Sequence, residues 1–198
     1  MKPIGLGKAF ITGGLLCAMS VFVAAADSGL RHPDGGREKL MPLRLDSASF
    51  PAGGMIPPRH TCDGADISPQ LAWAGLPAGT RSLVLIVDDP DAPDPAAPTM
   101  TWVHWVLYNL PPSAAGLAEG ITAGNLPQGT RQALNDWQRT GYGGPCPPIG
   151  RHRYVHRLYA LDVLLPELKP PTRARLEQAM RGHVLERTEL VGYYQRRP

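Results

Sequence analysis

Cysteine, phenylalanine and charged residues are scarce in this chain of 198 residues. It contains three cysteines and three phenylalanines, and only 19% of its residues are Asp, Glu, Lys or Arg. The cysteines include no C-x-x-C pair, which disfavours a structural zinc centre. The sequence has no basic tract and no basic patch interleaved with aromatic residues, so nucleic acid is not an expected partner.

Motifs of hydrolases and metalloenzymes are missing as well. G-x-S-x-G, which presents a serine nucleophile on a sharp turn, does not occur, and Ser68 stands between Ile67 and Pro69 without that pattern. H-E-x-x-H, which supplies a short-spaced pair of zinc ligands, is also missing. A hydrolase and a metal site of Asp89, Asp91, His104 and His152 remain alternatives. The main expectation is a protein that is not an enzyme and uses no cofactor.

The first 26 residues have the layout of a secretory signal peptide. Lys2 and Lys8 precede an apolar stretch over residues 9–23, and three alanines offer a cleavage site before Asp27. We therefore predict cleavage after Ala26, a periplasmic or secreted protein, and no transmembrane anchor after processing. A retained N-terminal anchor is the alternative, although the run falls short of the ~20 residues that span a bilayer.

Removal of residues 1–26 would leave about 170 residues, which is enough for one domain with its own hydrophobic core. It would also remove two lysines and no acid, so the net charge would fall from +3 to about +1. The two remaining cysteines, Cys62 and Cys146, most simply form one disulfide in an exported protein. The alternatives are two free thiols or half of a metal site.

The rest of the sequence predicts a flexible leader followed by a single β-rich domain. Residues 27–41 are polar and contain Pro33 and Gly35-Gly36, so they are interpreted as the leader. Residues 42–198 alternate short apolar segments with Gly, Pro, Asn and Asp clusters, which favours many short strands over long helices. The expected strands are residues 43–47, 70–73, 83–87, 103–109, 131–135, 154–161 and 188–194. One helix is expected after Thr172 as N-cap, and Gly182 ends it.

Two carboxylates and two prolines follow the most hydrophobic of these strands. Residues 83–87 are all aliphatic, and Asp89-Pro90-Asp91-Ala92-Pro93 comes shortly after them. Proline ends regular structure because it lacks an N–H group and fixes its backbone angle. Acidic groups at the end of a buried strand are costly unless they orient a partner or contact a ligand. A turn that merely ends the strand is the alternative interpretation.

Two further segments carry histidines at strand spacing. Period-two alternation places His104 on the same face as Trp102 and Val106. The same alternation places His152 on the face of Tyr154 and His156. Taken singly, each histidine is interpreted as a structural side chain, and His156 keeps that interpretation.

The loop that leads to the second of these segments is rich in glycine and proline. Residues 141–150 read G-Y-G-G-P-C-P-P-I-G. Glycine lets the backbone approach a ligand closely, and proline stiffens the loop. Exposed N–H groups of such a loop can cradle an oxyanion. The loop is therefore a candidate wall of a ligand site.

Together these segments resemble the signature blocks of the phosphatidylethanolamine-binding protein family, which includes the Raf kinase inhibitor proteins. The blocks are Asp89-Pro90-Asp91-Ala92-Pro93, Trp102-Val103-His104-Trp105, and Gly144-Pro145-Cys146-Pro147-Pro148 leading to His152-Arg153-Tyr154. Thr61-Cys62-Asp63-Gly64 with Ile67-Ser68-Pro69, and Asn135-Asp136-Trp137 with residues 141–144, resemble its bacterial YbhB/YbcL-type branch. The resemblance extends from Leu43 to Gln195.

The resemblance implies a mainly β fold, a sandwich of two antiparallel sheets with a few short helices, one of them near the C-terminus. It also implies a small cavity that takes phosphate-like anions and phospholipid head groups. The implied ligand-binding residues are Asp89, Trp102, His104, Gly144, Pro145, Pro147, His152 and Tyr154. This chain departs from the eukaryotic form by Cys146 and an extra proline before His152, and by a bacterial-type C-terminal end.

We therefore expect an exported, regulatory binding protein with a pocket for a small phosphorylated molecule or a phospholipid head group. Asp89 would repel a bare anion, by about 1 kcal/mol at 4 Å in water. It is expected either to orient a histidine whose imidazolium donates to the ligand, or to meet an ammonium group. In the first case, anion binding weakens as the pH rises above the histidine pKa. The alternative is an inhibitor of a protease or kinase that acts through a protein–protein surface, with an envelope or secreted enzyme as its partner.

Overall fold

A computed structural model describes residues 41–169 and 171–197 of the chain. The expected signal peptide over residues 1–26 and all but the last residue of the expected leader lie outside this part. No helix among the described residues is long and apolar enough to cross a lipid bilayer.

Strands dominate the described residues. The elements follow one another as β1 (Arg44–Asp46), the 3-10 turn η1 (Pro58–His60), β2 (Leu71–Ala74), β3 (Ser82–Asp89), β4 (Trp102–Leu110), β5 (Gly116–Leu117), the 3-10 turn η2 (Ala123–Asn125), β6 (Arg131–Gln132), β7 (His152–Leu161), α1 (Arg173–Met180) and β8 (Val184–Tyr194).

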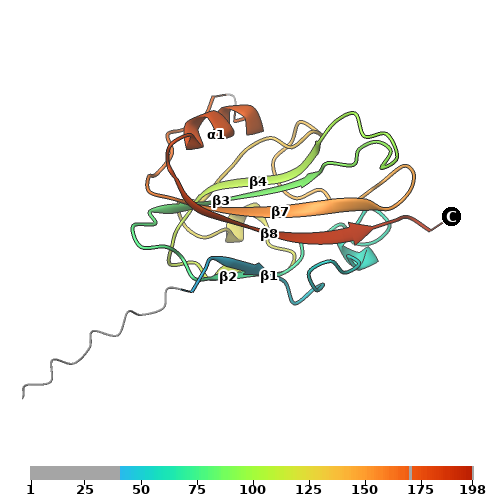
Figure 1. Cartoon of the computed structure of the whole chain (residues 1–198), viewed down its shortest axis with the longest axis horizontal. Coiled ribbons are helices and arrows are strands. Elements are labelled where there is room, and N and C mark those ends of the chain that lie inside the picture. Colours follow the sequence, from blue (N-terminus) through green and yellow to red (C-terminus); the bar gives the residue numbers. More distant parts are fainter. Residues whose placement is uncertain (1–40, 170, 198) are drawn as a thin grey trace, which may run out of the picture. The chain divides into compact units, whose positions relative to one another are not determined.

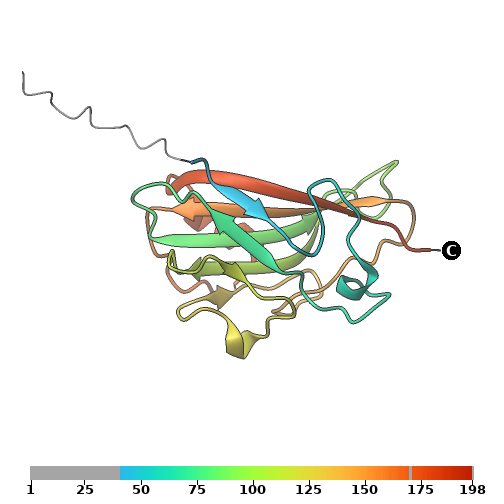
Figure 2. The same ribbon diagram turned by 90° about the horizontal axis from the view of Figure 1, so that it is seen from below.

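The strands form two antiparallel sheets that pack face to face (Figures 1 and 2). The smaller sheet has the order β1-β2-β5 and the larger one the order β6-β4-β3-β7-β8. Figure 1 shows α1 above the outer face of the larger sheet, with β1 and β2 below its inner face. The predicted sandwich with one helix near the C-terminus is confirmed.

Two hydrophobic clusters hold these layers together. One lies between the sheets and includes Leu71, Leu85 and Leu158, and the other lies beneath α1 and includes Ile86 and Leu176. The central strand β3 contributes to both clusters, and all eight of its residues are buried. A strand buried on both faces has no solvent-facing side, so polar residues do not alternate with apolar ones and its sequence is continuously apolar.

The helix begins and ends where the sequence predicts. The Thr172 hydroxyl accepts a hydrogen bond from the Arg175 N–H at 3.4 Å, and Gly182 adopts a φ of +79° after the last turn. The other boundaries shift: β8 begins at Val184, four residues before the expected start, and β6 ends at Gln132 instead of residue 135. The chain leaves β6 because Asn135 starts a tight turn, in which its side-chain oxygen accepts from two later backbone N–H groups.

Candidate functional site

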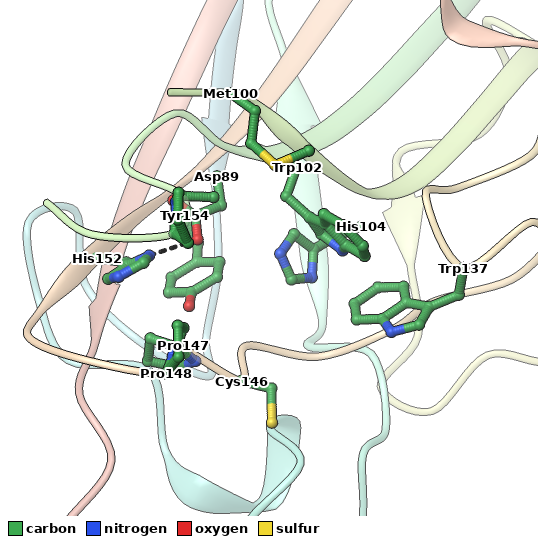
Figure 3. Close-up of a pocket in the computed structure, with 12 residues that line it drawn as sticks. Asp89, Met100, Trp102, His104, Trp137, Cys146, Pro147, Pro148, His152 and Tyr154 are labelled. Atoms are coloured by element: carbon green, nitrogen blue, oxygen red, sulfur yellow. Dashed lines mark hydrogen bonds and ion pairs between the residues drawn. The ribbon is translucent and has the colours of Figure 1, made fainter. Parts of the chain in front are cut away.

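A cavity of about 370 Å³ lies where β3, β4 and β7 meet the loops that flank them (Figure 3). Figure 3 shows His152 and Tyr154 on one side, His104 and Trp137 on the other, and the two prolines of the loop below them. The lining residues are Asp89, Ala92, Pro93, Met100, Trp102, His104, Trp137, Cys146, Pro147, Pro148, His152 and Tyr154. Most of them are apolar or aromatic, so the few polar groups decide what the cavity can bind.

Asp89 and His152 form a buried pair at one wall. The His152 Nδ1 lies 2.7 Å from the Asp89 Oδ2, and its Nε2 lies 2.9 Å from the Ile149 carbonyl oxygen. Both ring nitrogens therefore face oxygen atoms, whereas a neutral imidazole has only one N–H group. Both contacts become hydrogen bonds when the pair carries one proton more than a carboxylate and a neutral imidazole. The pair is then either imidazolium with carboxylate or imidazole with carboxylic acid. Burial raises the pKa of Asp89, and the hydrogen bond from His152 offsets part of that rise.

Asp91 holds the turn and does not line the cavity. Its N–H donates to the Asp89 Oδ1 at 2.8 Å, and its own carboxylate accepts from the Arg153 backbone N–H at 2.8 Å and from the guanidinium of the same residue. These hydrogen bonds from Arg153 lower the pKa of Asp91. The Ala92–Pro93 peptide bond that follows is cis.

A third carboxylate, Asp88, lies on the opposite face of β3. It is fully buried, forms an ion pair with Arg157, and its Oδ2 lies 2.7 Å from the guanidinium of Arg173 in α1. Burial raises the pKa of Asp88, and the two arginines oppose the rise. Asp88 was not among the expected site residues, although a carboxylate directly after the aliphatic residues 83–87 was an available signal.

A β-bulge aims His104 into the cavity. Val87 pairs with Trp105 while Asp88 pairs with Val103, so β4 carries His104 as one extra residue at this point. Trp102 and His104 both line the cavity, but Val106 packs in the cluster beneath α1. The expected shared face with Val106 is therefore wrong, because the extra residue reverses the alternation.

His104 is a neutral acceptor at physiological pH. Burial lowers its pKa to about 4, and the carbonyls of Gly143 and Gly144 offset only part of the shift. Its Nδ1 lies 2.7 Å from the Gly143 carbonyl oxygen, which can only accept, so Nδ1 carries the proton. The Nε2 therefore carries a lone pair.

Neither histidine offers a charged N–H group to a ligand. His104 is neutral because of its lowered pKa, and the second ring nitrogen of His152 is used by the Ile149 carbonyl. The sequence-based expectation of an imidazolium that donates to an anion is corrected accordingly.

The Tyr154 hydroxyl is a donor without a partner. The hydroxyl is buried, the residue lines the cavity, and no hydrogen-bond partner lies within reach of the hydroxyl among the described residues. Burial raises the pKa of Tyr154, so its hydroxyl keeps the proton. The ring packs edge-to-face against His104, with centroids 5.2 Å apart. A buried, unsatisfied hydroxyl costs about 1–3 kcal/mol, which a ligand atom that accepts its hydrogen bond would recover.

Two expected ligand residues, Gly144 and Pro145, lie behind the wall instead of lining it. The Gly144 N–H donates to the Asp66 Oδ1 at 2.6 Å, and the Pro145 carbonyl accepts from the Cys62 N–H at 3.1 Å. The Gly143 N–H likewise donates to the His104 carbonyl at 3.2 Å. These glycine N–H groups are thus occupied, and the expected oxyanion cradle is not formed by them.

The predicted disulfide is confirmed. Cys62 and Cys146 are bonded, with Cα atoms 5.4 Å apart, across 84 positions of sequence. Because Cys146 lines the cavity, the bond ties its wall to the loop that contains η1. Among the residues that the structure describes, no group of three His, Cys, Asp or Glu side chains could hold a metal ion.

Several lining residues were missed by the sequence reasoning, because they come from irregular loops. Met100 and Trp137 are the largest of them, and Trp137 packs edge-to-face on Trp102 at 5.4 Å and on His104 at 5.1 Å. The available signal for Trp137 was its place in the Asn135-Asp136-Trp137 block. The Asn135 side chain fixes this loop through four hydrogen bonds, two of which its nitrogen donates to the carbonyls of His104 and Gly141.

Comparison with known proteins identifies the family. The family model described as phosphatidylethanolamine-binding protein matches residues 46–195. The chain belongs to the phosphatidylethanolamine-binding protein family. A UPF0098 protein of Methanothermobacter thermautotrophicus is 48% identical over 156 residues, which cover 78% of this chain and 99% of the relative.

Two solved structures share the fold. The phosphatidylethanolamine-binding protein homologue CT736 of Chlamydia trachomatis is 40% identical, with a TM-score of 0.72, and the match covers 79% of this chain and 99% of the homologue. YbcL of E. coli, a member of the mammalian family, is 27% identical with a TM-score of 0.71, covering 79% of this chain and all of YbcL. The resemblance to the bacterial branch is thereby confirmed.

Proposed function

We propose that the cavity binds the phosphodiester head group of a phospholipid, or a soluble phosphodiester of the same chemistry, and that the protein is an exported binding protein with a regulatory role. The observation that supports the proposal is that the cavity lining holds one hydrogen-bond donor and one hydrogen-bond acceptor without partners in the protein. The buried Tyr154 hydroxyl can donate to a phosphoryl oxygen, and the His104 Nε2 can accept from an ammonium or hydroxyl group.

The charge balance of the cavity favours a monoanion that also carries a donor. No Lys or Arg is among the lining residues, and the Asp89–His152 pair holds its own proton. A dianionic phosphomonoester would lose much hydration without gaining a counter-charge. A phosphodiester with an ammonium group brings its own positive charge. This is the chemistry named in the description of the family.

The alternatives receive less support. The lining residues include no serine or threonine, their one cysteine is in a disulfide, and the raised pKa of Tyr154 keeps its hydroxyl protonated, so hydrolysis would lack an activated hydroxyl or thiol nucleophile. No contact among the described residues favours an inhibitory protein surface over the cavity. Export to the periplasm or beyond is supported by the signal-peptide pattern and by the disulfide, since such bonds persist in oxidising compartments.

Calorimetric titration with glycerophosphoethanolamine tests the proposal. Tyr154→Phe is expected to weaken binding about tenfold, the value of one neutral hydrogen bond, without lowering the melting temperature. Tyr159→Phe is the matched control, because Tyr159 lies on the same strand but packs toward the cluster beneath α1. Equal affinities for the wild type and Tyr154→Phe would refute the assignment of the donor.

The pH dependence separates this proposal from the imidazolium alternative. Because the pKa of His104 is lowered to about 4, affinity is expected to stay level from pH 8 to pH 6 and to fall as the pH approaches 4. Protonated His104 would then repel the ligand ammonium group. An affinity that rises steadily as the pH falls from 8 to 5 would favour a histidine that donates as imidazolium.

A further inference from the structure

A single peptide group connects His104 to a carboxylate outside the cavity. The His104 Nδ1–H donates to the Gly143 carbonyl oxygen at 2.7 Å. The N–H of the same peptide group, which belongs to Gly144, donates to the Asp66 Oδ1 at 2.6 Å. Asp66 does not line the cavity, and it lies between η1 and β2, far from β4 along the chain. The imidazole, the peptide and the carboxylate therefore form one chain of hydrogen bonds, in which each donor points toward Asp66.

This peptide group has little intrinsic restraint on its orientation. A Cβ at Gly143 would collide with the ring of Trp137. A Cβ at Gly144 would collide with the His60 carbonyl oxygen, so the packing requires glycine on both sides of the peptide. Glycine lacks the Cβ that restricts the backbone, and it populates conformations that other residues avoid. The orientation of the peptide between two glycines is therefore set by its hydrogen-bond partners.

The two possible orientations of this peptide have opposite consequences for the cavity. In the structure, the Gly143 carbonyl faces His104, so the proton is on Nδ1 and Nε2 carries a lone pair. After a half-turn, the Gly144 N–H would face Nδ1, which would then accept, and Nε2 would carry the proton. In Figure 3 the imidazole lies between Tyr154 and Trp137, with edge-to-face ring contacts at 5.2 and 5.1 Å. These contacts do not depend on the tautomer, so the ring keeps its place while the polarity of Nε2 changes.

Asp66 is compatible with only one of these orientations. A carboxylate can only accept, so it holds the Gly144 N–H but would repel the Gly143 carbonyl after a half-turn. Hydrogen bonds to a carboxylate are also about twice as strong as those between neutral groups. The backbone of Asp66 adopts a φ of +54°, a left-handed conformation that Asp and Asn tolerate better than most other residues. Both residue types suit the position, but only the carboxylate fixes the direction of the peptide.

We propose that Asp66 is a positioning residue that determines whether the cavity presents a hydrogen-bond acceptor or a donor at His104. The inference rests on the proposed function, because it names the residue that selects a ligand with an ammonium or hydroxyl group. With Asp66 in place, the cavity offers the Tyr154 hydroxyl as donor and the His104 Nε2 as acceptor. With the peptide reversed, it offers two donors, which suit an anion that has no donor of its own.

Asp66→Asn tests the role while keeping a hydrogen-bonding side chain of the same shape. The amide can turn its oxygen to the Gly144 N–H or its nitrogen to the Gly143 carbonyl, so both orientations gain a neutral hydrogen bond. The side chain is exposed, so the substitution leaves the core unchanged. The expected result is that His104 is protonated on Nδ1 alone in the wild type, and on Nε2 in about a third or more of Asp66→Asn molecules.

Nitrogen-15 NMR of the chain labelled at histidine measures this distribution. It is recorded near pH 7.5, where a pKa of about 4 leaves His104 neutral, and the signals are assigned by their loss in His104→Gln. Asp63→Asn is the matched control, because Asp63 lies in the same segment but accepts from Tyr194 and Arg196. It is expected to keep the wild-type tautomer. A wild type protonated on Nε2, or an Asp66→Asn variant protonated on Nδ1 as fully as the wild type, would overturn the inference.

Two soluble phosphodiesters separate this inference from the function on which it rests. Glycerophosphoethanolamine carries an ammonium group, and dimethyl phosphate carries no donor. Calorimetry is expected to show that the wild type prefers the first about tenfold, and that Asp66→Asn reduces this preference about threefold or more. If the tautomer shifts in Asp66→Asn but the wild type binds neither compound, the positioning role stands and the cavity function is wrong. If the wild type shows the preference but Asp66→Asn changes neither the preference nor the tautomer, the cavity function stands and the positioning role is wrong.

Discussion

His156 is expected to make the fold sensitive to acid. It lies in the middle of β7 on the face that packs between the sheets, with its ring centroid 5.5 Å from that of Phe50. Neither ring nitrogen has a hydrogen-bond partner in the described part of the chain. Burial lowers the pKa of His156 to about 4, and the carbonyls of Tyr154 and Leu190 offset only part of the shift.

The sign and the size of the effect follow from that pKa. The unfolded chain binds the proton near pH 6.5 and the folded chain only near pH 4, so the unfolded state holds more protons between these values. The contribution of neutral His156 to the free energy of unfolding is therefore present in full above pH 6.5, and it is lost as the pH falls toward 4. A difference of about 2.5 pKa units, at 1.36 kcal/mol each, gives a loss of about 3 kcal/mol between pH 7.5 and pH 4 from this residue alone.

Replacement by leucine removes the titrating group while keeping a similar volume. Urea unfolding, followed by tryptophan fluorescence at pH 7.5, 6, 5 and 4, measures the free energy of unfolding. His156→Leu is expected to be at least as stable as the wild type at pH 7.5, and its advantage is expected to grow by about 3 kcal/mol by pH 4. His183→Gln, at a partly exposed position paired with Asp162, is the control. If the wild-type and His156→Leu stabilities stay parallel across this range, His156 does not titrate as the burial argument requires.

Two further predictions concern the wall behind the cavity. Replacing Cys62 and Cys146 together by serine is expected to lower the free energy of unfolding by about 4–5 kcal/mol, because the disulfide closes a loop of 84 positions. A loss below about 1 kcal/mol, measured by urea unfolding, would contradict the loop-closure argument. Gly144→Ala is expected to cost about 2–3 kcal/mol, because a Cβ there would lie 2.4 Å from the His60 carbonyl oxygen. Gly124→Ala, where a Cβ meets nothing within 4 Å, is expected to change the melting temperature little, and equal melting temperatures for both variants would refute the steric argument.

Much of the fold could be predicted because the sequence obeys simple alternation. The strand β7 places His152, Tyr154 and His156 on its inner face as period-two spacing requires. The continuous apolar sequence of β3 reports burial on both faces. The Thr172 cap and Gly182 mark the ends of the helix, because their chemistry acts within one turn. Local rules of this kind can be applied without knowing the tertiary structure.

The sequence-based predictions failed at positions whose contacts are set by residues far away along the chain. Alternation failed at His104 because a bulge depends on the register between β3 and β4, which spacing within one strand does not reveal. The loop before His152 was expected to offer free N–H groups, but the Gly144 N–H is bound to Asp66, which lies 78 positions away. Met100 and Trp137 come from loops without periodicity, so strand or helix spacing could not place them at the cavity.

The four side-chain hydrogen bonds of Asn135 have a consequence for the thermodynamics of ligand binding. One side chain fixes both the carbonyl of His104 and the turn that carries Trp137. The loss of conformational freedom in this wall is therefore incurred when the chain folds and not when a ligand arrives. Ordering a flexible loop at the moment of binding would subtract that entropy from the affinity. A ligand that entered this cavity would meet a wall that is already ordered, so its affinity would not be reduced by the entropy of ordering this loop.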